Sequence, residues 1–120
     1  MIETAGLSHI HLSVCDLDRS VRFYRQVFGM EPLFSQPGKV TLRTPGAFDA
    51  ITLEQDPTTA RTGKSAGISH FGFRIKNPQR LDDAVLDVEA AGGHLVRRGQ
   101  HAPGQPLIHV ADPDGYVIEL

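Results

Sequence analysis

Three residues of the 120-residue chain suggest the clearest chemistry. His9 and His70 each follow a serine at matching places of two similar segments, and Glu119 lies in the last strand-like segment. Two histidines and one carboxylate can bind divalent Fe, Mn, Ni, Co or Zn and leave positions open for water or substrate. The alternatives are histidines hydrogen-bonded to backbone and a glutamate that faces solvent. The repetition of the Ser-His pair favours the metal site.

The last thirteen residues, 108–120, must position Glu119, and they have the pattern of a strand, a tight turn and a strand. The turn is Asp-Pro-Asp-Gly at 112–115, because proline presets φ at its second position and glycine accepts the exit geometry. Beyond the turn, Tyr116, Ile118 and Leu120 share one face of the predicted strand, whereas Glu119 lies on the other face. The carboxylate is therefore predicted on the face opposite the core.

The two histidines belong to a duplicated pattern. Residues 7–14 and 68–75 match position for position, and their Ser-His pairs at 8–9 and 69–70 coincide. Apolar and polar residues alternate in both segments, which is typical of a strand with one buried face. The residues of the apolar face are Ile10, Leu12 and Val14 in the first segment and Phe71, Phe73 and Ile75 in the second.

A helix is predicted after the first of these strands, over about 18–28. Asp16 or Asp18 can cap its N-terminus, and Gly29 supplies a C-terminal stop. Its apolar residues recur at steps of 4, 3 and 4, and they are Leu17, Val21, Tyr24 and Phe28.

The second half repeats this arrangement. Asn77 can cap a helix whose first position suits Pro78, and the pair Gly92-Gly93 ends it. The residues that line this helix are Leu81, Val85 and Val88.

The remaining elements complete an α+β fold of two βαβββ modules, at about 5–56 and 67–120. A connector at about 57–66 is rich in Pro, Thr, Gly, Lys and Ser. Since one helix covers one face of each sheet, the uncovered faces are expected to pair around a cavity. The predicted strands after each helix lie near 31–35, 39–44 and 48–54, and near 94–98, 107–111 and 116–120.

Composition excludes several classes of function. The net charge of −2 offers no basic stripe for nucleic acid, and no apolar run approaches membrane-spanning length. A single cysteine, Cys15, rules out an intrachain disulfide. No basic segment followed by an apolar one begins the chain, so a cytoplasmic protein is expected.

Four motifs together resemble the vicinal oxygen chelate superfamily, which holds glyoxalase I, fosfomycin-resistance thiol transferases, methylmalonyl-CoA epimerase, extradiol dioxygenases and bleomycin-resistance proteins. The resemblance spans nearly the whole chain and implies a single domain in which paired modules form an open barrel around a metal. It also implies a homodimer, in which the modules pair either within one chain or between the two chains. By position, His9, His70 and Glu119 match the family's ligands. The motifs are the Ser-His starts, Asp-Leu-x-x-Ser-x-x-Phe-Tyr at 16–24, Phe-Gly-Met at 28–30 and Asp-Pro-Asp-Gly-Tyr-x-x-Glu-Leu at 112–120.

Four further residues are candidates for substrate contact. Arg74 has the parity of His70 and Arg43 is expected to face inward, so the two cations can hold an anionic group, unless they are solvated. His11 shares the face of His9 as a cavity wall or a donor behind a ligand. His109 has a counterpart that touches substrate in the fosfomycin-resistance proteins, and it is a candidate acid or base.

Thr52 is a further candidate for substrate contact and Glu54 is a candidate catalytic residue, and the two share a face. Aligning Ile51 with Ile118 places Thr52 opposite Glu119, whereas a slide of two residues places Glu54 there. The resemblance implies that the choice between Thr52 and Glu54 bears on the type of reaction. Glyoxalase I and the epimerase use a fourth ligand on this strand, a glutamate that can act as base, whereas the thiol transferases lack it and leave room for a phosphonate.

The function expected is a metal-dependent, glyoxalase-like lyase or isomerase that acts on a small substrate with adjacent oxygens. The ion would act as a Lewis acid on developing charge. Alternatives are a thiol transferase of the fosfomycin-resistance kind, a ring-cleaving dioxygenase, and a metal-free drug-binding resistance protein.

Overall fold

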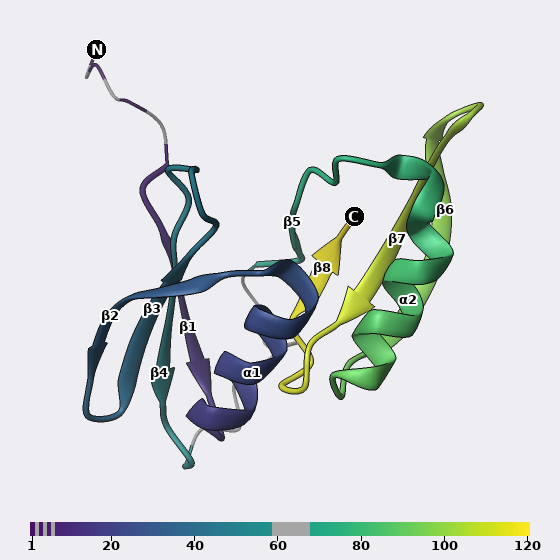
Figure 1. Ribbon diagram of the computed structural model, residues 1–120. Helices are drawn as coiled ribbons and strands as arrows, with labels where there is room; N and C mark the ends of the chain where they lie inside the picture. The colour runs from purple at the N-terminus through teal and green to yellow at the C-terminus, as the bar shows by residue number, and fades with distance from the viewer. Residues whose placement is uncertain (2, 4, 6, 59–67) are drawn as a thin grey trace. The chain divides into compact units, whose positions relative to one another are not determined.

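The computed structural model describes residues 1, 3, 5, 7–58 and 68–120, which fall into two compact units, Met1–Thr59 and Ala60–Leu120 (Figure 1). The first unit contains β1 (Ile10–Val14), α1 (Leu17–Phe28), β2 (Glu31–Gln36), β3 (Lys39–Arg43) and β4 (Ile51–Gln55). The second contains β5 (Phe71–Gly72), a 3-10 turn (Pro78–Arg80), α2 (Leu81–Ala90), β6 (His94–Ala102), β7 (Gln105–Ala111) and β8 (Val117–Glu119). The α+β class and the two βαβββ modules are confirmed. The predicted connector lies largely outside the described residues.

The two sheets share one topology. In the described part of the chain each unit has a four-stranded sheet, in the order β1-β4-β3-β2 and β5-β8-β7-β6. The first strand of each module pairs in parallel with the last, and the other pairings are antiparallel. In the first unit α1 packs against β3 and β4, and in the second α2 packs against β6 and β7. The internal duplication is therefore a duplication of sheet topology.

Helix α1 begins and ends where its caps dictate. The Asp16 side chain accepts a hydrogen bond from the Arg19 backbone N–H at 3.0 Å, and Gly29 closes the helix in the left-handed region at φ 64°. The buried face agrees with the prediction at Leu17 and Tyr24 and differs at Val21 and Phe28, which are only half-buried. The adjacent rings of Phe23 and Tyr24 pack edge to face at 5.3 Å and both turn inward. The fully or nearly buried residues of α1 are Leu17, Ser20, Phe23 and Tyr24.

The second helical segment agrees with its prediction. The Asn77 side chain accepts from the Gln79 backbone N–H at 3.2 Å, and Pro78 opens the 3-10 turn that leads into α2. The buried residues of α2 are Leu81, Val85 and Val88, as predicted. Neither this helix nor any other in the described ranges is long and apolar enough to cross a membrane.

Two strands differ in length from their predictions. β5 covers two residues where a strand over 68–75 was expected, because its partner β8 has only three residues to pair with. β6 runs on to Ala102, beyond the predicted end near 98, because it forms a hairpin with β7 closed at Gly104, whose φ is 79°. The longer β6 brings His101 within reach of Glu119.

The turn before β8 fixes the direction from which Glu119 arrives. The buried Asp112 carboxylate accepts hydrogen bonds from the backbone N–H groups of Asp114 and Tyr116, both at 2.9 Å. Gly115 adopts a φ of 90°, which a residue with a side chain rarely adopts. The predicted Asp-Pro-Asp-Gly turn therefore joins β7 to β8, and Ile118 is buried while Glu119 lies on the other face.

Candidate metal centre

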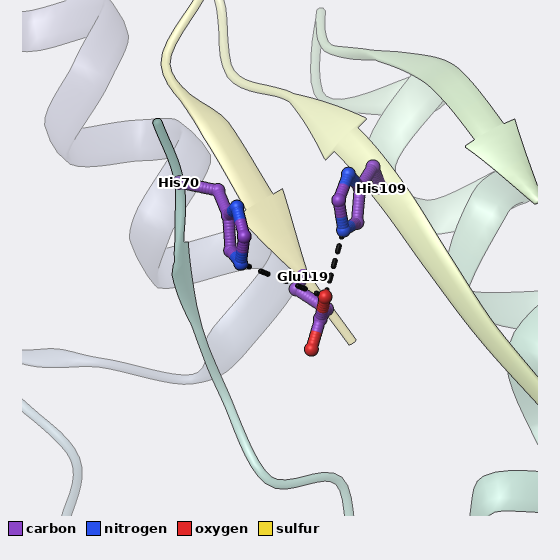
Figure 2. A group of neighbouring side chains, drawn as sticks. All are labelled: His70, His109 and Glu119. Carbon is purple, nitrogen blue, oxygen red and sulfur yellow. Dashed lines mark hydrogen bonds and ion pairs between the residues drawn. The ribbon is translucent and has the colours of Figure 1, made fainter. Parts of the chain in front are cut away.

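A cluster of two histidines and one glutamate lies in the second unit (Figure 2). His109 Nε2 is 2.7 Å and His70 Nε2 is 3.6 Å from the same carboxylate oxygen, Glu119 Oε2. One ligand atom from each of the three residues lies within 4.8 Å of the others, and Figure 2 shows both imidazole rings turned toward the carboxylate. Imidazole nitrogens and a carboxylate oxygen are ordinary ligands of divalent transition metals. The cluster therefore fits the divalent ion expected from the sequence.

The sheet register aligns this cluster. Arg97 on β6 is opposite His109 on β7, His109 is opposite Glu119 on β8, and Glu119 is opposite Gly72 on β5. Residues directly opposite on neighbouring strands share a face, so the row brings their side chains together. A Cβ at Gly72 would lie 3.1 Å from the Glu119 backbone oxygen. The missing side chain leaves space beside Glu119.

Exposure differs across the cluster. His109 is 6% exposed and is the most buried residue of the cluster. Glu119 is half-buried, and His70, which directly precedes β5, is exposed. The hydrogen bond from His109 holds the pKa of the Glu119 carboxyl below its usual value, although burial acts in the opposite direction. Positive charge on His101, His109 or His70 lowers the same pKa further. Glu119 is thus held in the ionised form that a metal ligand requires.

Sequence reasoning missed two neighbours of this cluster. His101 Nε2 is 3.2 Å from Glu119 Oε1, and Arg97 Nε donates to His109 Nδ1 at 3.2 Å. Both lie on β6, whose predicted end near 98 excluded His101. The signal that could have found it is the Pro-Gly pair at 103–104, which is typical of a hairpin turn joining two long strands.

The Ser-His pairs adopt the same local arrangement in both units. The Ser8 hydroxyl is 2.8 Å from His9 Nδ1, and the Ser69 hydroxyl is 3.4 Å from His70 Nδ1. In each case Nε2 is left as the nitrogen that can bind a metal. His9 is exposed and belongs to the first unit, so the ligand set of His9, His70 and Glu119 draws on both units and stays a prediction.

The register of the first sheet bears on the choice between Thr52 and Glu54. Thr52 is opposite His11, and Glu119 is opposite Gly72. Because His11 and Gly72 occupy matching places of the repeat, Thr52 has the place of Glu119, in agreement with the alignment of Ile51 with Ile118. Glu54 lies one pleat further along β4.

The polar residues of the first sheet are paired with one another. The Thr52 hydroxyl is 2.9 Å from the Thr41 hydroxyl, and Thr52 is buried. His11 Nε2 is 2.8 Å from Glu54 Oε2, and both of these side chains are about half exposed. Arg43 ends β3 with the parity of Thr41 and is exposed.

Arg74 belongs to the second unit, as Glu119 does. Both line a cavity of about 590 Å³, together with His101 and Leu107. A guanidinium group and the candidate metal ligand thus share one cavity, which is the setting that an anionic substrate group would need.

Comparison with known proteins adds the family. The model of the Glyoxalase/Bleomycin resistance protein/Dioxygenase superfamily matches residues 6–120. The chain belongs to this superfamily. Its members share a fold but differ in reaction, so membership alone does not select the chemistry.

Two relatives illustrate the range of the superfamily. The chain is 32% identical to a probable lactoylglutathione lyase of Vibrio parahaemolyticus, over 93% of this chain and 86% of that protein. It is 28% identical to a manganese-dependent 2,3-dihydroxybiphenyl 1,2-dioxygenase of Geobacillus genomosp. 3, over 98% of this chain but only 36% of that protein. The chain thus spans about a third of the length of this dioxygenase.

Among solved structures, a variant of the fosfomycin resistance protein FosX from Listeria monocytogenes superimposes with a TM-score of 0.80. The identity is 22%, over 98% of this chain and 90% of that one, which shows a common fold. That protein was crystallised with Mn(II) and 1S,2S-dihydroxypropylphosphonic acid.

Proposed function

We propose that this protein is a divalent-metal-dependent enzyme with glyoxalase-like lyase or isomerase activity on a small substrate with adjacent oxygens. The observation that carries the proposal is the convergence of His70 and His109 on the ionised Glu119 carboxylate. Membership of the superfamily and the Vibrio lyase relative favour the lyase or isomerase class. The proposed ligands are His9, His70 and Glu119.

The metal, when bound, supplies a Lewis acid that stabilises negative charge developing on substrate oxygen. The chain's own residues would bind and orient the substrate. Arg74 shares the cavity of Glu119 and can hold an anionic group, and Arg43 offers a second guanidinium on the first sheet. The FosX relative, crystallised with a phosphonic acid, is consistent with an anionic substrate.

Metal content and turnover test the proposal together. Protein purified without chelator is expected to carry one divalent ion per chain, and the chelator-treated protein should bind Mn(II), Fe(II), Co(II), Ni(II) or Zn(II). Turnover is then measured as formation of lactoylglutathione from glutathione and the corresponding 2-oxoaldehyde, as cleavage of 2,3-dihydroxybiphenyl, and as addition of a thiol to fosfomycin. Activity on the second or third compound alone would replace the lyase assignment with ring cleavage or thiol transfer. A folded protein that binds no metal would contradict the proposal.

Glu54→Gln is expected to change metal affinity and turnover by less than about threefold, the range of surface substitutions. The reason is that Glu54 lies one pleat beyond the counterpart of Glu119 and is paired with His11. Calorimetric titration with Mn(II) and a turnover assay check this result. Loss of activity with metal binding and fold intact would instead identify Glu54 as the catalytic base.

The protein is also expected to be a homodimer. β2 is an edge strand of the first sheet, all of its residues are exposed, and Phe34 is 69% exposed. An exposed edge with apolar side chains is normally covered by another chain or element. Light scattering at micromolar concentration should give twice the mass of one chain. A monomeric mass under these conditions would contradict the prediction.

A further inference from the structure

Arg97, His109 and Glu119 form a linear series of contacts across three neighbouring strands. Arg97 Nε donates to His109 Nδ1 at 3.2 Å, and His109 Nε2 is 2.7 Å from Glu119 Oε2. A guanidinium group only donates hydrogen bonds, and an ionised carboxylate only accepts them. Arg97 Nη2 also lies 3.4 Å from His109 Nε2, but the contact of Nε2 with the carboxylate is much shorter, so His109 accepts at Nδ1 and donates at Nε2. The neutral tautomer with its proton on Nε2 satisfies both contacts.

We infer that Arg97 is a positioning residue, which fixes His109 in the Nε2–H tautomer so that His109 orients the Glu119 carboxylate. His109 is then a donor to a metal ligand, in place of the acid or base role expected from the sequence. Side chains that donate a hydrogen bond to a metal ligand set the orientation of that ligand and tune the properties of the metal. The inference rests on the proposed metal site, because it assigns Glu119 as a ligand.

The same contacts argue against His109 as a ligand. One of its ring nitrogens is nevertheless close enough to the ligand atoms of His70 and Glu119 to share an ion with them. Its Nε2 is committed to Glu119, and Arg97 Nη2 lies 3.4 Å from that nitrogen. A metal ion on Nε2 would face this fixed positive charge at short range, which is unfavourable. His70 differs in this respect, because its Nδ1 contacts the neutral Ser69 hydroxyl and its Nε2 is the nitrogen that can bind a metal.

The first module provides an internal comparison for this arrangement. Its residues at the places of His109 and Glu119 are Thr41 and Thr52, whose hydroxyls are 2.9 Å apart. The residue opposite Thr41 is Phe34, which has no polar side-chain atom. A cross-strand hydrogen bond at this place therefore needs no arginine for the fold.

The second sheet also leaves space for the Arg97 guanidinium. A Cβ at Gly99, two residues along the same strand, would lie 3.2 Å from Arg97 Nη1. The position next to Arg97 on its face thus carries no side chain. This is consistent with a guanidinium that folds back over the sheet to reach His109.

Arg97→Met tests the inference because it removes the N–H donors and keeps an unbranched side chain. In the full chain, the affinity for Mn(II) alone is expected to fall by about 10- to 100-fold. In the metal-free protein, nitrogen NMR of the His109 ring should change from the Nε2–H tautomer to a mixture of both tautomers. The matched control is Arg98→Met, because Arg98 has the opposite parity and contacts Asp82 at 2.7 Å. It should change neither the affinity nor the spectrum.

Substitutions of His109 supply the second arm. Gln can donate through its amide nitrogen to Glu119 and accept from Arg97 through its amide oxygen, whereas Leu can do neither. His109→Gln is therefore expected to retain Mn(II) affinity within about tenfold, and His109→Leu to lose about as much as Arg97→Met. Circular dichroism confirms that each variant is folded.

Each contrary outcome has a distinct meaning. Unchanged affinity in Arg97→Met and His109→Leu would overturn the inference and leave the proposed metal site standing. Equal losses in His109→Gln and His109→Leu, both as large as in Glu119→Gln, would show that His109 is a ligand and would also overturn it. Failure of the unsubstituted protein to bind Mn(II) or any other divalent ion would overturn the proposed function itself.

Discussion

Glu119→Gln is expected to lower the affinity for Mn(II) by more than about 100-fold, since even substitutions behind a metal ligand commonly cost 10- to 100-fold. The change replaces the ionised oxygen on which His70 and His109 converge with a neutral amide of the same shape. Calorimetric titration of the metal-free protein measures the loss. Turnover should fall with it, because the proposed ion holds the substrate oxygens.

The matched control for this substitution is Glu89→Gln on the exposed side of α2. It makes the same change of charge away from the cluster, so Mn(II) affinity should be unchanged. The unfolding midpoint of Glu119→Gln should also stay close to that of the unsubstituted protein, since the amide still accepts a hydrogen bond from His109. A Glu119→Gln protein that binds Mn(II) normally would rule out Glu119 as a ligand.

Phe23→Ala is expected to lower the free energy of unfolding by about 3–5 kcal/mol, the usual cost of removing a buried phenyl ring. Phe23 is fully buried in α1 and packs edge to face against Tyr24 and Phe28, at 5.3 and 6.0 Å between ring centroids. Urea unfolding followed by circular dichroism measures the change. The lost stability should be that of the first unit, because these rings all belong to that unit.

Val21→Ala serves as the comparison, because Val21 lay on the predicted buried face of α1 but is only half-buried in the structure. It should cost about 1 kcal/mol or less, in proportion to the apolar area that it loses. Equal costs for the two substitutions would mean that the helix buries the face predicted from sequence.

Local signals predicted most elements of the fold. The cap at Asp16, the stop at Gly29 and the alternation at 10–14 all act within a few residues, so they can be recognised without knowing the partner strands. The buried face of α1 was predicted correctly at Leu17 and Tyr24, but Ser20 and Phe23 are buried in place of Val21 and Phe28. Its orientation depends on how Phe23 and Tyr24 fit the sheet, which spacing alone does not specify.

The candidate site was predicted in its residue types but not in its neighbours. The matched Ser-His pairs and the strand parity of Glu119 are visible in the sequence. The contacts of Arg97 and His101 depend on the pairing of β6 with β7, which contains two irregularities, between Leu95 and Arg97 and between Gln100 and Ala102. Such irregularities change which residues lie opposite each other on the two strands, and no local sequence pattern predicts them.

The short β5 strand has a consequence for the speed of metal exchange. His70 immediately precedes β5, which pairs with β8 over two residues. Among the described residues, one further backbone hydrogen bond joins this segment to β8, from the Phe73 N–H to the Glu119 backbone oxygen at 3.0 Å. Segments with so few backbone bonds open at a small fraction of the free energy of global unfolding. The His70 arm can therefore detach while the β6–β7 hairpin stays intact. Loss of the His70 ligand would then follow the fraying rate of one short strand, independent of how stable the module is as a whole.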